Sequence, residues 1–478
     1  MNPRQMTRRD FLKTSAAAAL AFGAGTNSDV RIAVVGLGGI DIPGSVGGRG
    51  RQLIKSFQSV PGVKIVALCD VDQAILDHSV QEFKKRGENV AAHADFRRVL
   101  DDKNVDAVVL ATPNHWHALG TIWACQAGKD VYVEKPCSYN IWEGRQMVAA
   151  ARKFGRVVQV GTQRRASAAL PQAFEYLRSG QLGQMRCAHA LVYRARTGIG
   201  GNRQAPTPVP QTVDYDLWCG PVPKWSVFRN HLHYEWHWVW LTGNGEMGNN
   251  GVHMMDICRW GLGQNQPPPR AMSIGGRFAF NDAGETPNVH IAFLDYQPVP
   301  IICEIRNVQA DKSKSLGKCR NADKGIVIVC EGGHFTGDYT GGTVFDNKGA
   351  KVKEFKDGRS TRDLEVAHIA NFIAAVRSRK ADSLNAEIQI GHVSAACCHM
   401  ANVSHRLGKQ TSSDEIRETI KSNPTLSDAF DRCREYLREN GVDLGKTPAV
   451  LGPWVTVDEA GKLFRRKDRT PFVVPEIV

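Results

Sequence analysis

An apolar segment that ends in glycines, close to the start of the chain, constrains the fold more than any other feature. Residues 30–39 read VRIAVVGLGG, which is typical of the first strand of a doubly wound parallel sheet. A helix is expected near residues 49–59, and apolar segments recur at residues 63–72, 105–119 and 130–140. The sequence therefore predicts an α/β fold that begins with a parallel sheet.

The glycines after the first strand indicate a phosphate-binding turn. A G-x-G-x-x-G pattern is interrupted, because position 41 holds aspartate where a third glycine is expected. If residues 40–48 are an insertion, Gly36, Gly38 and Gly50 restore the pattern. Gly36 would then permit the tight turn, Gly38 the approach of a pyrophosphate, and Gly50 the contact between helix and strand.

The second strand ends in an acidic residue at the expected distance from this turn. Without the insertion, about 25 residues separate Gly36 from Asp70, close to the roughly 20 that are typical. A carboxylate at this point accepts hydrogen bonds from ribose hydroxyls and repels a 2′-phosphate, which favours NAD over NADP. The alternative is a strand-end aspartate that caps the next turn.

Polar residues also follow the next two strands. Thr112, Pro113, Asn114 and His117 follow one of them, and Glu134-Lys135-Pro136 ends the other. Ligands of open α/β sheets bind beyond the carboxyl ends of the strands, so both groups are expected to face the cofactor.

The first residues of the chain form an export signal. Residues 7–13 read TRRDFLK and precede the weakly apolar TSAAAALAFGAG, so residues 1–28 are interpreted as a twin-arginine signal. The alternative is the basic first turn of an alanine-rich helix. Twin-arginine export moves folded proteins, so we expect a periplasmic protein that passes through the export machinery with its cofactor.

Composition excludes several other classes. The net charge is +13, but lysine and arginine are spread among acidic residues, with no basic stripe interleaved with aromatic residues, which argues against nucleic-acid binding. No apolar run reaches the roughly 18–20 residues of a membrane span, so no stable insertion is expected after processing. The 12 cysteines contain no C-x-x-C pair and fit buried apolar positions.

Several motifs in a fixed order resemble the Gfo/Idh/MocA family of glucose–fructose oxidoreductase and inositol dehydrogenase relatives. They are the strand with GxG, then CDVD, ATPNHWH, YVEKP, QVGTQRR, LWCGPVPKW, WHWVW and GNGEMGNNGVHMMD. The resemblance implies an N-terminal Rossmann domain at residues 29–155. It also implies a C-terminal α/β domain with an open, mainly antiparallel sheet at residues 156–478, with helices near 363–410 returning toward the first domain. In this family the sheet forms the substrate wall and often a subunit interface, so a homo-oligomer is expected.

The resemblance places the chemistry at residues 243–260. His253 and Asp256 are three residues apart and share one face if a helix begins near Gly251. His253 is the expected acid/base, with Asp256 orienting it. Lys135 is expected to stabilise the developing alkoxide of the substrate or to relay the proton of its hydroxyl. The chain has Asn249 where the family commonly has aspartate. The alternative for His253 is an ordinary core histidine beside two methionines.

The predicted site falls into three groups. The catalytic residues are Lys135, His253 and Asp256. The cofactor-binding residues are Gly36, Gly38, Gly39, Gly50, Asp70, Thr112, Pro113, Asn114, His117, Glu134 and Lys135. The substrate-binding residues are Gln163, Arg164, Trp236, Trp238, Asn249 and His253.

A metal site is the main competing interpretation of one segment. In HLHYEWH, alternation along a strand would put His231, His233 and Glu235 on one side, with His237 nearby. The flanking tryptophans favour a sugar-contacting wall instead, so no metal is predicted.

Together these features predict an NAD-dependent oxidoreductase that acts on a secondary alcohol of a sugar, glycoside or cyclitol. Two alternatives remain: a redox-neutral glycosidase or lyase on the same scaffold, and a non-catalytic, NAD-containing sugar-binding protein. Because the protein is exported folded, NAD is expected to stay tightly bound, covered by residues 40–48 and by the Pro/Trp-rich residues 200–225.

Overall fold

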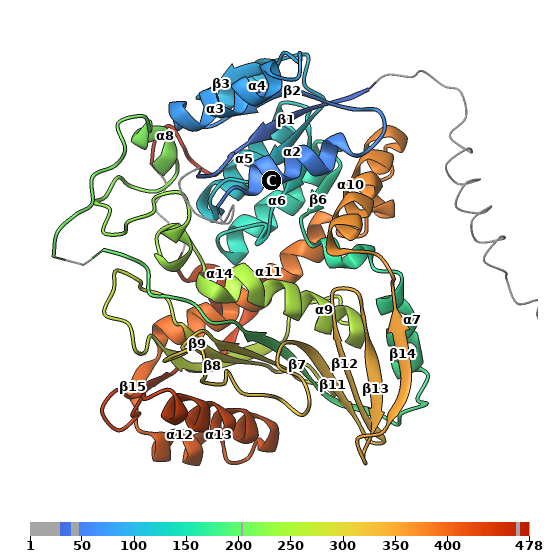
Figure 1. Cartoon of the computed structure of the whole chain (residues 1–478), viewed down its shortest axis with the longest axis vertical. Helices are drawn as coiled ribbons and strands as arrows, with labels where there is room; N and C mark the ends of the chain where they lie inside the picture. Colours follow the sequence, from blue (N-terminus) through green and yellow to red (C-terminus); the bar gives the residue numbers. More distant parts are fainter. Residues whose placement is uncertain (1–28, 40–46, 202–203, 465–468, 478) are drawn as a thin grey trace, which may run out of the picture.

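A computed structural model describes residues 29–39, 47–201, 204–464 and 469–477. Two α/β layers lie one above the other, a parallel sheet with its helices and a larger sheet below it (Figure 1). The signal segment 1–28 and most of the proposed insertion 40–48 lie outside the described residues.

The first sheet is wholly parallel, in the order β3-β2-β1-β4-β5-β6, which is the Rossmann order. Its strands are β1 (Val30–Val35), β2 (Val63–Cys69), β3 (Ala91–His93), β4 (Ala107–Leu110), β5 (Asp130–Val133) and β6 (Val158–Val160). Its helices are α2 (Arg49–Gln58), α3 (Gln73–Lys84), α4 (Phe96–Asp101), α5 (Asn114–Gln126) and α6 (Ile141–Lys153). The boundary predicted after residue 155 is therefore one strand too early, because β6 pairs with β5.

Local sequence explains these elements. Strands β4 and β5 are apolar and buried along their whole length, as expected for a parallel sheet covered on both faces. Helix α2 buries Leu53, Ile54 and Phe57 against the sheet. The side chains of Asp72 and Asp95 accept hydrogen bonds from the first turns of α3 and α4 and so fix where these helices begin.

The second sheet runs in the order β14-β13-β12-β11-β7-β10-β9-β8-β16-β15, with β17 paired to β8. It is antiparallel except for the β7–β10 pair, as the family resemblance implies. Its strands are β7 (Met185–Tyr193), β8 (Arg270–Gly276), β9 (Val289–Leu294), β10 (Ile301–Arg306), β11 (Gly325–Cys330), β12 (Gly333–Asp338), β13 (Gly341–Asp346), β14 (Lys351–Lys356), β15 (Lys409–Thr411), β16 (Ala449–Leu451) and β17 (Val455–Thr456).

Helices cover both faces of this second sheet. Helices α9 (Val252–Leu262) and α11 (Ile388–Leu407) lie between it and the first domain, and α7 (Ala169–Arg178) packs beside α9 against β13 and β14 (Figure 1). On the opposite face, α12 (Ser413–Ile420) and α13 (Pro424–Glu439) pack on β8, β9 and β10. The shorter elements are α8 (Tyr215–Cys219), α14 (Val457–Lys462), η2 (Gln163–Ala166), η3 (Glu235–Trp238), the π-helical turn η4 (Met247–Gly251) and η5 (Ala381–Ser383). Helices α12 and α13 therefore cover this part of the outer face.

Two helices and a late segment join the layers. Helix α10 (Thr361–Ser378) packs Ile369 and Phe372 into the core of the first domain, and α11 contacts α6. The predicted return of these helices toward the first domain is therefore observed. Farther along the chain, Phe472 packs against Trp116 and Trp123 of α5.

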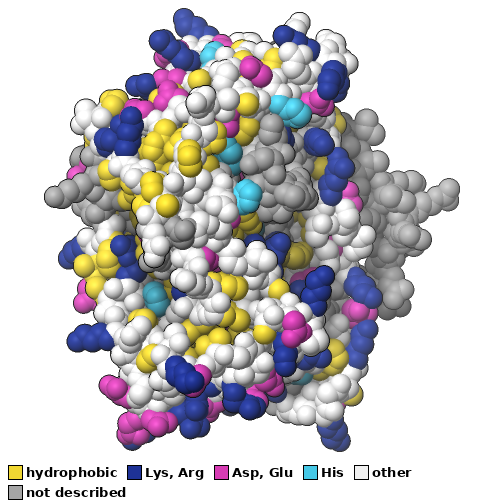
Figure 2. Space-filling view, turned by 60° about the vertical axis from the view of Figure 1, so that its left-hand side comes forward, with side chains coloured by type: hydrophobic (Ala, Val, Ile, Leu, Met, Phe, Trp, Pro, Cys, Tyr) yellow, Lys and Arg dark blue, Asp and Glu magenta, His cyan; other side chains and the backbone are white. Residues whose placement is uncertain are grey.

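The distribution of charged residues and of cysteines in the structure can be compared with the expectations from composition. On the face drawn in Figure 2, lysine and arginine side chains are interspersed with aspartate and glutamate. All 12 cysteines are free and buried, as expected for apolar core positions. Among the described helices, none combines the length and apolarity that a membrane crossing requires.

Buried histidines predict acid sensitivity. Burial lowers the pKa of His392 and His368 to about 4 and that of His399 to about 3. The unfolded chain takes up these protons near pH 6.5, whereas the folded chain stays neutral, so the free energy of unfolding falls as pH drops below about 6.5. The loss is at most about 1.4 kcal/mol per pH unit for each histidine.

The measurement is denaturant unfolding between pH 7.5 and 4.5. His399→Gln keeps an amide that can bond to Ser138 and should reduce the pH slope. His78→Gln, at an exposed position on α3, serves as the matched control. Equal slopes for His399→Gln and the wild type would contradict the prediction.

Candidate active site

A cavity of about 490 Å³ lies at the carboxyl ends of the first sheet's strands. Its volume is within the roughly 300–1,000 Å³ of ligand sites. One wall comes from the first domain, and the opposite wall comes from segments 217–218, 233–237 and 249–250 of the second. Most of the predicted residues line it: Gly36, Gly38, Asp70, Thr112, Pro113, Asn114, His117, Glu134, Lys135, Gln163, Trp236 and Asn249.

The glycine turn is built as the interrupted motif suggests. Gly36 has φ +82°, and a Cβ there would lie 2.7 Å from the backbone nitrogen of Thr112. A Cβ on Gly50 would lie 2.0 Å from the Gly36 carbonyl oxygen, so the helix approaches the turn this closely only because residue 50 is a glycine. A Cβ on Gly38 would meet the Gly47 carbonyl oxygen at 1.5 Å. The two flanks of the proposed insertion therefore meet, and Gly38 serves this contact.

Asp70 is fixed at the edge of the cavity by backbone groups. Its Oδ2 accepts from the Leu37 amide at 2.7 Å and its Oδ1 from the Asp72 amide at 3.0 Å. Burial raises its pKa, while these bonds and the nearby His233 oppose that effect. Asp70 thus holds the turn and also lines the space where a ribose would bind. A dinucleotide fits this arrangement of glycine turn, strand-end carboxylate and cavity.

The other strand-end residues are tied to one another. Both ring nitrogens of His117 face backbone carbonyls, Nδ1 that of Pro136 at 2.7 Å and Nε2 that of Thr112 at 2.8 Å. His117 therefore joins the ends of β4 and β5, and its nitrogens are occupied. Asn114 donates to Asn244 at 2.9 Å, which links the first domain to the second.

Lys135 is the most distinctive group in the cavity. Its Nζ donates to the backbone oxygen of Asn249 at 2.9 Å and to the Oδ1 of Asn249 at 3.1 Å. Burial lowers its pKa to about 8, although the carboxylate of Glu134 opposes the shift. An amine with such a pKa exchanges protons readily near neutral pH.

His253 lies on the first turn of α9, beyond the η4 turn that carries Asn249. It is buried, and its Nδ1 has no hydrogen-bond partner among the described residues. Burial, followed by the charges of Arg164 and Lys135, lowers its pKa well below the usual value. The imidazole is therefore neutral.

Three predicted site residues do not lie where their expected roles require: Asp256, Trp238 and Arg164. Asp256 does not orient His253, because its carboxylate accepts from Arg165 at 2.8–3.0 Å and from Ser394 at 2.7 Å. Trp238 lies outside the cavity lining, packed between Tyr234 and Arg196. Arg164 also stands behind the lining, where its guanidinium stacks on Tyr339 at 3.3 Å. Arg194, Trp218, Tyr234 and Asn250 also line the cavity, although they are not among the predicted site residues, and so does His237, which the sequence suggested only as a metal ligand.

The alternative metal half-site lacks the strand geometry on which it rested. Residues 235–238 form the η3 turn instead of a strand, so alternation does not apply. His233 pairs with Asp72 at 2.9 Å, and Glu235 accepts from the backbone amides of His231 and Gly200. These groups already have protein partners.

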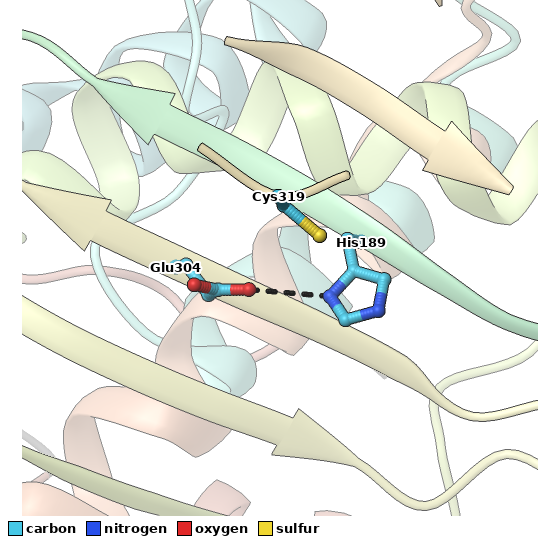
Figure 3. A group of neighbouring side chains, drawn as sticks. All are labelled: His189, Glu304 and Cys319. Carbon is cyan, nitrogen blue, oxygen red and sulfur yellow. Dashed lines mark hydrogen bonds and ion pairs between the residues drawn. The ribbon is translucent and has the colours of Figure 1, made fainter. Parts of the chain in front are cut away.

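Another cluster, which no sequence pattern indicated, brings together His189 of β7, Glu304 of β10 and Cys319 on one face of the second sheet (Figure 3). Within the described residues it is the group with the spacing of a metal site. However, Glu304 accepts from His189, Tyr193, Arg306 and Arg432, with a bidentate pair to Arg432 at 2.8 Å. Two guanidinium groups on one carboxylate leave no site for a cation, so the cluster is a buried ion-pair network.

Comparison with known proteins agrees with this geometry. An oxidoreductase family with an NAD-binding Rossmann fold, Gfo/Idh/MocA, matches residues 30–162. The C-terminal alpha/beta domain of this family matches residues 193–433, about half of the chain. The chain belongs to the Gfo/Idh/MocA family. A twin-arginine signal sequence matches residues 5–25, which confirms the predicted export route.

Curated relatives of this Gfo/Idh/MocA protein match over part of its length. Inositol 2-dehydrogenase of Salmonella typhimurium is 31% identical over 151 residues, covering 30% of this chain and 43% of that protein. Glycosyl hydrolase family 109 protein 1 of Shewanella sp. is 31% identical over 113 residues, covering 23% of this chain and 25% of that protein. The chain thus matches less than half the length of these relatives.

Solved structures share the fold over most of the chain. The WlbA dehydrogenase of Bordetella pertussis, in complex with NADH and UDP-GlcNAcA, has a TM-score of 0.53 at 20% identity and covers 77% of this chain and 94% of that one. An oxidoreductase of Agrobacterium radiobacter, in complex with NAD+, L-tartaric acid and magnesium, has a TM-score of 0.52 at 14% identity, covering 78% and 94%.

Asp70 provides a test of cofactor preference. Asp70→Asn keeps an oxygen for the Leu37 or Asp72 amide but removes the charge that repels a 2′-phosphate. The ratio of NAD to NADP affinity should fall about 10–100-fold, the usual weight of one charged hydrogen bond. Binding is measured by titration of both dinucleotides, with Asp77→Asn on the exposed face of α3 as control. An unchanged ratio would remove Asp70 from the ribose site.

Lys135 provides a test of the proton-transfer step. Lys135→Met should keep the dinucleotide bound but reduce turnover about 10²–10⁴-fold. In the wild type, alcohol oxidation should rise with pH through about 8, because the amine must be unprotonated to accept a proton. Asn249→Asp adds a negative charge and should move this limb to higher pH.

The control for this test shows whether the loss of any lysine charge changes the pH profile. Lys153→Met removes an exposed lysine at the end of α6 and should leave the pH profile unchanged. Normal turnover in Lys135→Met would refute the assigned role.

Proposed function

We propose that this Gfo/Idh/MocA protein is an exported NAD-dependent oxidoreductase that acts on a secondary alcohol of a sugar, glycoside or cyclitol. The observation that carries the proposal is the position of Lys135, a lysine of lowered pKa on the wall of the cavity that holds the glycine turn and Asp70. The part-length similarity to inositol 2-dehydrogenase supports a polyhydroxylated substrate.

Lys135 is arranged to accept a hydroxyl proton. In the neutral amine, two N–H groups donate to the two oxygens of Asn249, which leaves the lone pair free for a substrate hydroxyl. After proton transfer, the ammonium retains both bonds and stabilises negative charge on the substrate oxygen. Bound NAD supplies the hydride acceptor. The pKa of His253 is lowered well below its usual value, so this neutral imidazole is a weaker proton acceptor than Lys135.

The segment that covers the cavity supports tight retention of NAD. Gln73 and Asp214 exchange backbone hydrogen bonds with Thr212 and Val71, so residues 212–214 pair with the first domain. His233 pairs with Asp72 farther along the same segment. These contacts hold residues 212–238 across the cavity, as expected for a protein exported with its cofactor.

Redox-neutral glycosidase activity is a second candidate. It is favoured by the similarity to a family 109 glycosyl hydrolase over part of the chain. The same lysine, amide and cofactor site would serve transient oxidation followed by elimination and return of the hydride.

The test uses protein purified without added nucleotide. Denaturation should release about one NAD per chain, and His233→Gln should lose NAD faster during dialysis.

A panel of sugars and cyclitols should then produce reduced-nicotinamide absorbance in the wild type and not in Lys135→Met. Release of aglycone from aryl glycosides without net reduction would assign the glycosidase. Bound NAD with neither activity would identify a sugar-binding protein, and substoichiometric, rapidly exchanging NAD would exclude retention.

A further inference from the structure

The acidic groups around the catalytic end of the cavity are already paired. Glu134 binds Arg49 at 2.9 Å, Glu246 binds Arg196 at 3.0 Å, and Asp256 binds Arg165 at 2.8 Å. Lys135 has only the neutral oxygens of Asn249 as hydrogen-bond acceptors. Of the described lysine and arginine side chains that line the cavity, Arg49 is ion-paired, whereas Lys135 and Arg194 have no ion-pair partner among the described residues.

Arg194 is one of these cations and lines the cavity directly. It follows the last residue of β7, and its backbone is fixed to the sheet: its amide donates to Arg306 and its carbonyl accepts from Asn307. Its side chain is exposed, and its guanidinium has no hydrogen bond or ion pair within the described part of the chain. The backbone is thus rigid while the charged group is available to a ligand.

Arg164 is a second arginine near the cavity without an ion-pair partner among the described residues. It is only 5% exposed, stacks on Tyr339 and contacts the sulfur of Met254 at 3.9 Å. No carboxylate of the described residues lies within ion-pair distance of it. A buried charge without a counter-ion is costly, and an anion bound in the neighbouring cavity would offset that cost. Gln163, the adjacent residue on η2, lines the cavity.

We propose that the substrate is a sugar acid whose carboxylate is bound by Arg194, in a cavity end made electropositive by Arg164 and Lys135. A guanidinium presents a planar fork that matches a carboxylate with two parallel hydrogen bonds. The inference rests on the proposed function, because it names the substrate class of the same site. It adds a specificity-determining residue that no sequence motif indicated.

The test compares charged and neutral ligands on the NAD-loaded protein. D-glucuronate, D-galacturonate and D-mannuronate are each measured beside the matching neutral hexose and hexose 6-phosphate, both by calorimetric binding and by kcat/KM. A uronate should be preferred over its neutral hexose about 10–100-fold, the usual weight of a charged hydrogen bond. Arg194→Gln should abolish this preference mainly through KM, and Arg194→Lys should restore part of it. Arg438→Gln, which removes an exposed charge on α13, is the control and should retain the preference.

The outcomes distinguish this inference from the proposed function. Equal use of neutral hexoses and uronates would overturn the inference while leaving the oxidoreductase in place, and so would a preference for phosphates. A uronate preference that survives in Arg194→Gln would overturn the role of Arg194. Binding of uronates without any reduction of the nicotinamide would support the inference and count against the oxidoreductase.

Discussion

The buried ion-pair cluster around Arg49 determines how the rest of the site is arranged. Arg49 begins α2 directly after the glycine turn and binds both Glu134 at 2.9 Å and Glu365 of α10 at 2.6 Å. Burial disfavours its charge, but the two carboxylates outweigh that effect and raise its pKa. One side chain therefore connects the phosphate turn, the residue before Lys135 and the helix returning from the second domain. Removing Arg49 would leave two largely buried carboxylates without an ion-pair partner, which is far more costly than losing an exposed ion pair.

Asn249 explains why a lysine in this position can transfer protons. The amide holds Lys135 with two oxygens yet carries no negative charge, so burial lowers the pKa to about 8 while the direction of Nζ stays fixed. A carboxylate at residue 249 would orient the amine equally well but would stabilise its protonated form. Because residue 249 is asparagine where the family commonly has aspartate, the neutral form of Lys135 is favoured and this lysine can accept a proton.

Most of the first domain could be predicted from the sequence, and the reason is physical. Parallel strands buried on both faces give uninterrupted apolar segments such as residues 105–110, and the turn after β1 tolerates only glycine at Gly36 and Gly50. Side-chain partners across the chain were less predictable. Asp256 and His253 have the spacing of neighbours on one helix face, but Asp256 pairs with Arg165, which comes from a turn far away in the sequence, and not with His253. The histidines at 231–237 alternate in sequence, but the chain there forms a 3-10 turn packed by tryptophans. Arg194 carried no signal, because an arginine after a strand is usually only a solvated charge.

The two halves of the cavity differ in how well the sequence predicts them. The cofactor half consists of backbone turns and strand ends, whose requirements appear directly as glycines and as an acid at a fixed distance. The substrate half consists of side chains from four segments that meet only in the folded protein: residues 163, 194, 233–237 and 249–250. Substitutions in these segments change charge and shape at the substrate without disturbing the turn that binds the dinucleotide. Specificity can therefore diverge on a constant cofactor site, and the distribution of charge among these side chains is the most direct evidence of the substrate.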